Sequence, residues 1–340
     1  MAGLITGIVA SRRTNLPEIA AKAPDQTKPE SRVERFRRFV KNDKIRYESF
    51  FLPYLSDLLQ ALAERGTLYI VFDGSAIGRD TVVLMASVVY QGRALPLAWI
   101  VRRGKKGHFS ADVHLELLAH LRQLVPERAE VVLLGDGEFD STRLQQALEE
   151  AAWHYVLRTA KDAQLEGTDG EVFLFKEAYP ADGETWCSLP GMRFTSQRYG
   201  PVHAVVWHDR RYRAPIYLLT SFELAAWACH SYRKRARIET FFSDQKSRGF
   251  NLQRSHMSDP ARLARLLMAA CLAYIWIVYL GTLAKAEGWD KVIHRSSRCD
   301  LSLFQLGLRL LEHMLNEGWV IEVAFTVVFE PAQDSLRTSY

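Results

Sequence analysis

TLYIVFDGS, residues 67–75, is a short run of strand-forming residues that ends at Asp73-Gly74. The following segment, residues 80–103, predicts two more strands joined by a hairpin at 91–93. Apolar residues with helical spacing then alternate with short apolar runs, which predict helix, strand, helix and strand at 109–125, 129–137, 141–153 and 154–160. Three consecutive strands followed by alternating helices and strands indicate an α/β domain.

The rest of the chain is organised around this domain. With 340 residues, the chain is long enough for one large core and smaller attachments. Residues 67–160 and 216–260 are predicted to form the core, while 161–215, rich in glycine, aspartate and aromatic residues with short strand-like pieces, is predicted to be a β-rich insertion. The flanking regions, 1–66 and 261–340, are predicted to be mostly helical.

The composition is that of a soluble globular protein, with 48% hydrophobic and 24% charged residues. The net charge of +5 is a mild indication of a polyanionic partner, and the basic residues are concentrated in 28–46 and 210–254. The four cysteines are far apart without a C-x-x-C pair, which argues against a structural zinc site or a disulfide scaffold. We therefore expect a cytoplasmic protein.

Residues 266–284 contain no charged residue and are close to the length that spans a bilayer. A core helix that is apolar on all sides has the same hydropathy, so both interpretations are open from this segment alone.

Three carboxylates lie where the predicted elements bring distant parts of the chain together. Asp73 and Asp136 each follow a predicted strand, and the carboxyl ends of parallel strands gather at one edge of a sheet. Glu239 lies on a helix predicted from a capping box at Thr220 and Glu223 to about Arg248. Three carboxylates together repel one another unless a cation neutralises them, and hard oxygen ligands favour two Mg²⁺ or Mn²⁺ ions.

The same helix places Tyr232, Arg235, Glu239 and Lys246 within about 60° of one another if it is a regular α-helix. This arrangement predicts an acid beside groups that bind phosphate, which is the chemistry of a nuclease or strand transferase. The simpler alternatives are turn residues at the two Asp-Gly pairs and a surface ion pair between Arg235 and Glu239. Glu138 and Asp140 are alternative acids close to Asp136.

These residues resemble the DDE transposases of the IS4 group from bacterial insertion sequences. The Y-x2-R-x3-E-x6-K signature of that group is met in full by Tyr232, Arg235, Glu239 and Lys246, and VFDGS and LLGDGEFDS are similar to its two aspartate motifs. The resemblance implies an RNase H-like core with a mixed five-stranded sheet, and a homodimer that acts on the terminal inverted repeats of the element and on target DNA. It also implies that Asp73, Asp136 and Glu239 bind the metal ions.

Further DNA contacts follow from the resemblance and from the distribution of charge. In several members of the group a tryptophan of the insertion stacks on a flipped base, and Trp207 or Trp186 are the candidates here, although each is also suited to filling the insertion's own core. Basic residues that are candidates for phosphate contacts are Arg102, Arg103, Lys105, Lys106 and, on the N-terminal helix, Arg32, Arg35 and Arg38. The resemblance favours burial of 266–284 over a membrane span. A non-cutting DNA-binding protein or a different RNase H-like nuclease are the alternative functions.

Overall fold

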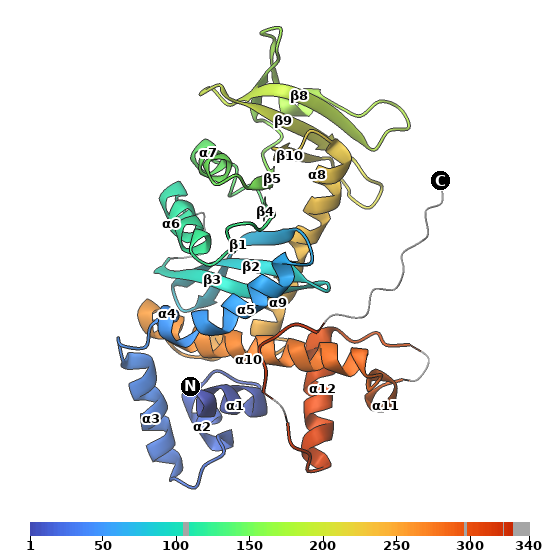
Figure 1. The fold of residues 1–340 in the computed structure, drawn as a ribbon. Helices are drawn as coiled ribbons and strands as arrows, with labels where there is room; N and C mark the ends of the chain where they lie inside the picture. Colours follow the sequence, from blue (N-terminus) through green and yellow to red (C-terminus); the bar gives the residue numbers. More distant parts are fainter. Residues whose placement is uncertain (105–108, 296–297, 322, 329–340) are drawn as a thin grey trace. The chain divides into compact units, whose positions relative to one another are not determined.

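The computed structural model describes residues 1–104, 109–295, 298–321 and 323–328 (Figure 1). The chain forms two compact units. The sheet unit comprises Ala63–Ser243 with Ser258–Pro260, and the helical unit comprises Met1–Leu62, Asp244–Met257 and Ala261–Tyr340. Lys105 and Lys106 lie outside the described residues.

Five strands form the core of the sheet unit, in the order β3-β2-β1-β4-β5. Their bounds are Leu68–Gly78 (β1), Thr81–Tyr90 (β2), Arg93–Arg103 (β3), Val131–Gly135 (β4) and His154–Arg158 (β5). The hairpins β1–β2 and β2–β3 are antiparallel, whereas β1–β4 and β4–β5 are parallel. β4 is buried along its whole length, as its uninterrupted apolar run requires. The predicted α/β fold with a mixed five-stranded core sheet is therefore confirmed.

The β-rich insertion continues the same sheet. From β5 the order runs through β10, β9, β8, β6 and β7, which gives one ten-stranded sheet. These strands are Ile216–Thr220 (β10), Tyr199–Trp207 (β9), Trp186–Phe194 (β8), Gln164–Glu166 (β6) and Val172–Leu174 (β7), and a 3-10 turn, Phe175–Glu177 (η1), follows β7. The insertion has a hydrophobic cluster of its own, to which β10 contributes Leu219.

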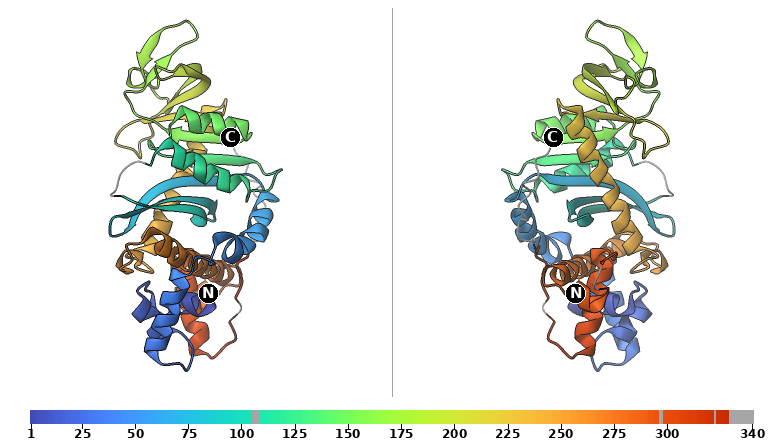
Figure 2. Two further views of the ribbon diagram at one scale, coloured as in Figure 1. Left: turned by 90° about the vertical axis from the view of Figure 1, so that its left-hand side faces the viewer. Right: turned by 90° about the vertical axis from the view of Figure 1, so that its right-hand side faces the viewer.

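Helices cover both faces of the core sheet (Figures 1 and 2). α6 (Ala111–Arg122) and α7 (Thr142–Glu150) lie on one face, and α8 (Ala225–Tyr232), the 3-10 turn η2 (Arg233–Ala236) and the start of α9 (Arg237–Gln245) lie on the other. The single helix predicted from Thr220 to about Arg248 is wrong in two respects, because it begins five residues later and is interrupted by η2.

Thr220 belongs to a strand and does not cap a helix. It is the last residue of β10, and its hydroxyl donates to the carbonyl of Tyr155 at 2.7 Å and accepts from the Phe222 amide at 3.1 Å. The threonine therefore ends a strand. Its hydroxyl bonds to backbone groups there, as the hydroxyl of a threonine that caps a helix does, so the sequence pattern alone does not distinguish the two positions.

The helical unit contains the N-terminal and C-terminal helices. Their bounds are Ala2–Ser11 (α1), Leu16–Lys22 (α2), Pro29–Lys41 (α3), Tyr47–Phe50 (α4), Leu52–Ala63 (α5), Leu252–Arg254 (η3), Pro260–Ala286 (α10), Asp290–Ile293 (α11) and Leu303–Asn316 (α12). The prediction that both ends of the chain are helical is confirmed.

The apolar segment 266–284 lies in α10. α10 is long and apolar enough to cross a membrane, and 94% of its most apolar window is buried. It crosses α12 at two glycines: a Cβ on Gly281 would lie 1.9 Å from the Leu303 carbonyl oxygen, and one on Gly307 would lie 1.9 Å from that of Ile277. Tyr274 also stacks on Phe304 with ring centroids 5.3 Å apart. This close packing is typical of a core helix.

Candidate active site

Asp73 in β1 and Asp136 directly after β4 occupy equivalent register positions relative to the pairing of these two parallel strands. The β1–β4 pairing ends at Val71 opposite Leu134, and each aspartate follows two residues later. β1 itself continues to Gly78 by pairing with β2, so Asp73 lies within a strand and not at its end as predicted. The register nevertheless brings both carboxylates to the same edge, where β1 and β4 separate.

One guanidinium joins these aspartates to the predicted third acid. Arg235 Nη2 lies 2.9 Å from Asp136 Oδ2 and 3.4 Å from Asp73 Oδ2, and its Nη1 donates to Glu239 Oε1 at 2.7 Å. Only 16% of the Arg235 side chain is exposed. The structure therefore brings Asp73, Asp136 and Glu239 together around a single cation, although η2 replaces the regular helix assumed in the prediction.

The three carboxylates differ in their exposure to solvent. The exposed fraction of the side chain is 16% for Asp73, 33% for Asp136 and 61% for Glu239. Burial raises the pKa of Asp73 to about 6, and the nearby charges of Asp136 and Glu239 add to this. Arg235 and the Gly74 amide, which donates to Asp73 Oδ1 at 2.8 Å, act in the opposite direction. The cluster thus carries more negative charge than one guanidinium neutralises.

These oxygens suit a hard divalent cation, which would relieve the same repulsion. Within the described residues, no three acidic, histidine or cysteine side chains converge on one point as a preassembled metal site. The acids converge on Arg235 instead. The donor set fits Mg²⁺ or Mn²⁺ in chemical type, and the ions would take over the neutralisation that Arg235 provides.

Tyr232 is the last residue of α8 and is buried. Burial raises its pKa to about 12, while the charges of Arg235 and Arg158 act to lower it. The phenol therefore remains protonated at neutral pH and is a hydrogen-bond donor near the two arginines. Lys246 directly follows α9 and belongs to the helical unit. Its backbone carbonyl accepts from the amides of Gly249 and Asn251.

Glu138 and Asp140, the alternative acids, hold neighbouring segments in place. Glu138 Oε1 accepts from the Phe109 amide at 2.6 Å and lies 3.6 Å from His114 Nε2. Asp140 Oδ2 accepts from the Thr159 hydroxyl at 2.6 Å. Asp136 is linked to this loop as well, since the Glu138 amide donates to Asp136 Oδ1 at 3.0 Å. These contacts fix the orientation of Asp136.

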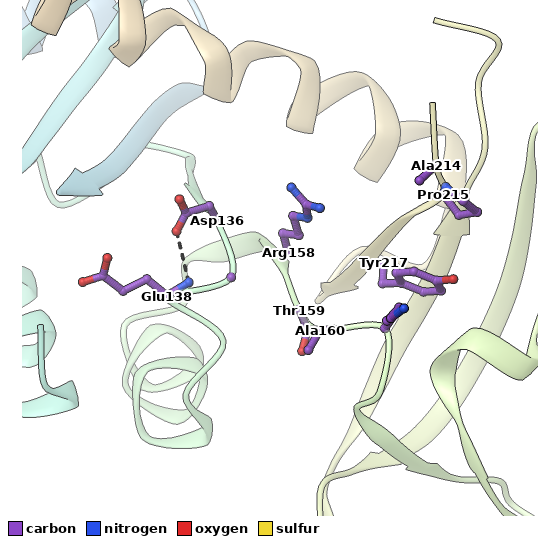
Figure 3. A pocket seen from close by; sticks show the side chains of 10 residues that line it. Asp136, Glu138, Arg158, Thr159, Ala160, Ala214, Pro215 and Tyr217 are labelled. Atoms are coloured by element: carbon purple, nitrogen blue, oxygen red, sulfur yellow. Dashed lines mark hydrogen bonds between the residues drawn. The ribbon is translucent and has the colours of Figure 1, made fainter. Parts of the chain in front are cut away.

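A cavity of about 670 Å³ opens beside Asp136 (Figure 3). It is lined by the loop after β4, the end of β5 and the start of β10, with residues Asp136, Gly137, Glu138, Arg158, Thr159, Ala160, Lys161, Ala214, Pro215 and Tyr217. Sequence reasoning did not identify Arg158, Lys161 or Tyr217. The carboxyl ends of parallel strands gather at one edge of a sheet, and this argument, which predicts Asp136 there, also places Arg158 there because it is the last residue of β5.

The other predicted basic residues have varied surroundings. Arg102 forms two 2.8 Å contacts from Nη2 to the Glu116 carboxylate, and Arg103 is exposed at the end of β3. In the helical unit, Arg35 pairs with Asp25, whereas Arg38 is exposed. Arg32 is turned inward, with 13% of its side chain exposed and Nη1 donating to the Ala23 carbonyl at 2.7 Å. Arg32 therefore holds the N-terminal helices together and does not face solvent as predicted.

The two candidate tryptophans face each other across β8 and β9. Trp207 is fully buried, with Tyr212 edge-on at 4.9 Å and the Arg233 guanidinium 5.1 Å from its ring. Side chains alternate along β9, so Trp207 lies on the opposite face from Val206, which belongs to the insertion's own hydrophobic cluster, and the ring is buried outside that cluster. Base stacking by Trp207 would require the ring to become exposed, and it stays a prediction. Trp186 is 37% exposed.

Comparison with known proteins yields one family and several distant structural likenesses. The family described as "Transposase DDE domain" matches residues 76–276, which include Asp136 and Glu239 and begin just after Asp73. A structure of a piggyBac transposase synaptic complex with hairpin DNA is similar to this chain. The alignment covers 93% of this chain and 70% of the piggyBac transposase chain, with 10% sequence identity and a TM-score of 0.48.

Two endonucleases align over smaller parts of the chain. The alignment with human ENDOV covers 57% of this chain and 92% of the ENDOV chain, with 14% sequence identity and a TM-score of 0.29. The alignment with Ciona intestinalis Endonuclease V, in complex with inosine-containing DNA, covers 50% of this chain and 77% of the endonuclease chain, with 14% sequence identity and a TM-score of 0.28. No curated protein matches the chain.

Proposed function

Because this chain belongs to the DDE transposase family, we propose that it cuts DNA at the ends of an insertion sequence and joins the freed 3′-hydroxyl to target DNA. The observation that carries this proposal is the contact of one guanidinium with Asp73, Asp136 and Glu239, which come from three separate elements. The spacing of Tyr232, Arg235, Glu239 and Lys246 supports membership of the IS4 group.

Enzymes of this family depend on divalent metal ions. We propose two Mg²⁺ ions, or Mn²⁺ in their place, held by Asp73, Asp136 and Glu239. When bound, such ions activate the attacking oxygen and stabilise the leaving oxygen of a phosphodiester. The hard carboxylate oxygens and the elevated pKa of Asp73, to about 6, support a site that gains from added positive charge.

The chain's own residues prepare this site. Arg235 neutralises part of the acidic cluster before DNA arrives, and its guanidinium is then suited to a phosphate oxygen. The bond from the Gly74 amide fixes the orientation of Asp73, and the bond from the Glu138 amide fixes that of Asp136. Tyr232 supplies a protonated hydroxyl close to Arg235.

The proposed partners are double-stranded DNA with the terminal inverted repeats of the element, and target DNA. The remaining cations at the end of β3 and on α3, Arg103 and Arg38, are exposed and suited to phosphates. By analogy with the IS4 group we propose a homodimer on DNA, in the bacterial cytoplasm at the nucleoid. The four free cysteines agree with a reducing compartment.

Cleavage of the element's own ends tests this proposal. Purified protein with Mg²⁺ should nick DNA that carries the segments flanking its coding region, and Glu239→Gln should abolish nicking while DNA binding is retained. Glu130→Gln is a matched control, because this exposed acid lies before β4, at the end of the strand opposite Asp136.

The products decide between the alternatives. Joining of the 3′-hydroxyl end to a second DNA indicates transposition, whereas cutting without joining indicates a different nuclease. Binding without cutting by the unsubstituted protein would contradict an active enzyme.

A further inference from the structure

We propose that Lys234 is a positioning residue of the active site. Its ammonium group lies on the face of the Tyr69 ring, where it holds the η2 turn on β1 and thereby keeps Arg235 and Glu239 opposite the two aspartates. The inference rests on the proposed function, because metal-dependent cutting requires the glutamate to meet the aspartates. It assigns a role to two residues that neither the aspartate motifs nor the Y-x2-R-x3-E-x6-K signature contain.

Three consecutive cations of η2 reach three different parts of the sheet unit. Arg233 Nη2 lies 3.2 Å from Asp209 Oδ2, in the loop after β9. Lys234 Nζ lies 3.8 Å from the centroid of the Tyr69 ring on β1, and Arg235 contacts the acidic cluster. A 3-10 turn has three residues per turn, so successive side chains point about 120° apart. The turn is therefore supported in three directions.

The face of β1 that carries Asp73 also carries Tyr69. Side chains alternate along a strand, so residues 69, 71 and 73 share one face and Phe72 lies on the other. Phe72 packs edge-on against Phe139, on the face of the sheet that α6 covers. Tyr69 and Asp73 are therefore on the η2 side, with their Cα atoms about 13 Å apart along the strand. Two neighbouring cations of η2 reach one each, and this fixes how the turn lies along β1.

Apolar packing alone does not determine this position. Ile238 and Phe241 of α9 are fully buried and keep the helix on the core, but the burial of apolar area has no preferred direction. The η2 turn ends three residues before Glu239, whose side chain is 61% exposed. The contact of Lys234 with the ring supplies the direction that apolar burial lacks.

The ring face is a suitable partner for a cation that is partly removed from water. Lys234 and Tyr69 are both half-buried. Burial lowers the pKa of Lys234, because the ammonium group loses part of its hydration. The negative face of an aromatic ring replaces some of that hydration, and the attraction is stronger when the cation is desolvated. The contact is therefore stronger than a typical exposed ion pair.

A set of variants of the full chain tests the contact. Lys234→Met removes the charge and keeps an apolar stem, and Tyr69→Leu removes the ring. Lys234→Arg and Tyr69→Phe retain a cation and a ring, whereas Lys234→Met/Tyr69→Leu combines the two losses. Lys176→Met is the matched control, because Lys176 also lies in a 3-10 turn of the sheet unit and its ion pair with Asp162 is exposed.

The measurements separate positioning from DNA binding and from folding. Single-turnover cutting at saturating Mg²⁺, with DNA that carries the segments flanking the coding region, gives the rate of the chemical step. Titration with Mn²⁺, followed by electron paramagnetic resonance of the free ion, gives the metal affinity without any cutting. Fluorescence anisotropy in EDTA gives the affinity for the same DNA and its salt dependence, and thermal denaturation gives the stability.

We expect Lys234→Met and Tyr69→Leu each to lower the cutting rate and the Mn²⁺ affinity about tenfold, which corresponds to the loss of one partly buried cation–π contact. The affinity for DNA should not change, because the ammonium group contacts the ring. The double variant should lose no more than the more impaired single variant, since both substitutions break the same contact. Lys234→Arg, Tyr69→Phe and Lys176→Met should retain the cutting rate of the unsubstituted protein.

Several outcomes overturn the inference while the proposed function stands. A loss in Lys234→Met that Tyr69→Leu does not share, or weaker DNA binding with a smaller salt slope, means that the lysine contacts phosphate. Additive losses in the double variant mean that the two side chains act separately. A lower unfolding temperature with unchanged metal affinity and cutting rate means that the contact only stabilises the fold.

The metal titration also distinguishes a failure of the proposed function. If the unsubstituted protein binds Mn²⁺ without cutting, and the variants lose metal affinity as expected, the inference is supported and only the activity is contradicted. If the unsubstituted protein neither cuts DNA nor binds Mn²⁺, the proposed function and the inference fail together.

Discussion

Replacing Asp73 by asparagine should stabilise the metal-free protein at neutral pH, although it removes a proposed metal ligand. The pKa of Asp73 is about 6 in the folded protein, compared with 3.8 for the unperturbed group. Each unit corresponds to about 1.4 kcal/mol, so ionising this carboxyl in the folded state costs about 3 kcal/mol. Asparagine keeps an oxygen for the Gly74 amide and carries no charge.

The sign of the pH dependence follows from the elevated pKa. Between about pH 4 and pH 6 the folded state retains the proton that the unfolded chain has lost, so stability falls as the pH rises through this range. Asp73→Asn should therefore exceed the unsubstituted protein in free energy of unfolding by about 2 to 3 kcal/mol at pH 8, and by almost nothing below pH 4.

Urea denaturation in EDTA across this pH range measures the difference. Asp162→Asn is the control of opposite sign, because the bond from Lys176 lowers the pKa of this exposed acid. Mg²⁺ should raise the stability of the unsubstituted protein and have little effect on Asp73→Asn. A variant that is less stable at pH 8, or a difference that does not depend on pH, would refute the reasoning about charge repulsion in the acidic cluster.

Two further predictions concern packing. Trp207→Ala should lower the free energy of unfolding by about 3 to 5 kcal/mol because the ring is fully buried, whereas Trp186→Ala should lower it by about 1 kcal/mol. Denaturant titration of both variants compares the two losses, and equal losses would contradict the full burial of Trp207. Gly281→Ala should lower the free energy of unfolding by at least about 2 kcal/mol, because the alanine Cβ would lie 1.9 Å from the Leu303 carbonyl oxygen. This loss should exceed the gain from the better helix propensity of alanine. Thermal denaturation measures the change, and an unchanged melting temperature would mean that α10 and α12 do not cross at this residue.

The pairing of Asp73 with Asp136 could be predicted from the sequence because parallel strands place residues of equal register at one edge. Glu239 could be predicted because the apolar residues beside it, Ile238 and Phe241, pack inward and thereby turn the stripe with the acid toward the two aspartates. Both inferences depend on local geometry that repeats in every sheet and helix.

The features that the sequence did not reveal depend on tertiary contacts. Thr220 and Glu223 match a helix cap, yet the hydrogen bond from Thr220 to the Tyr155 carbonyl makes the threonine the end of a strand. Arg158 stands alone in the sequence, and only the fold places it next to Asp136 and Tyr217. The inward position of Arg32 depends likewise on the Ala23 carbonyl, which no periodicity shows.

The continuity of the sheet through β5, β10 and β9 has a consequence for how the insertion can vary. Cutting out residues 161–215 would leave the backbone amides and carbonyls along the side of β10 that pairs with β9 without partners, an open edge that invites association with other chains. Additions or losses of length are tolerated more readily at the far end, around β6 and β7, where the ladder already stops. Related chains with shorter insertions should therefore retain a strand equivalent to β10 and differ mainly in the hairpins beyond it.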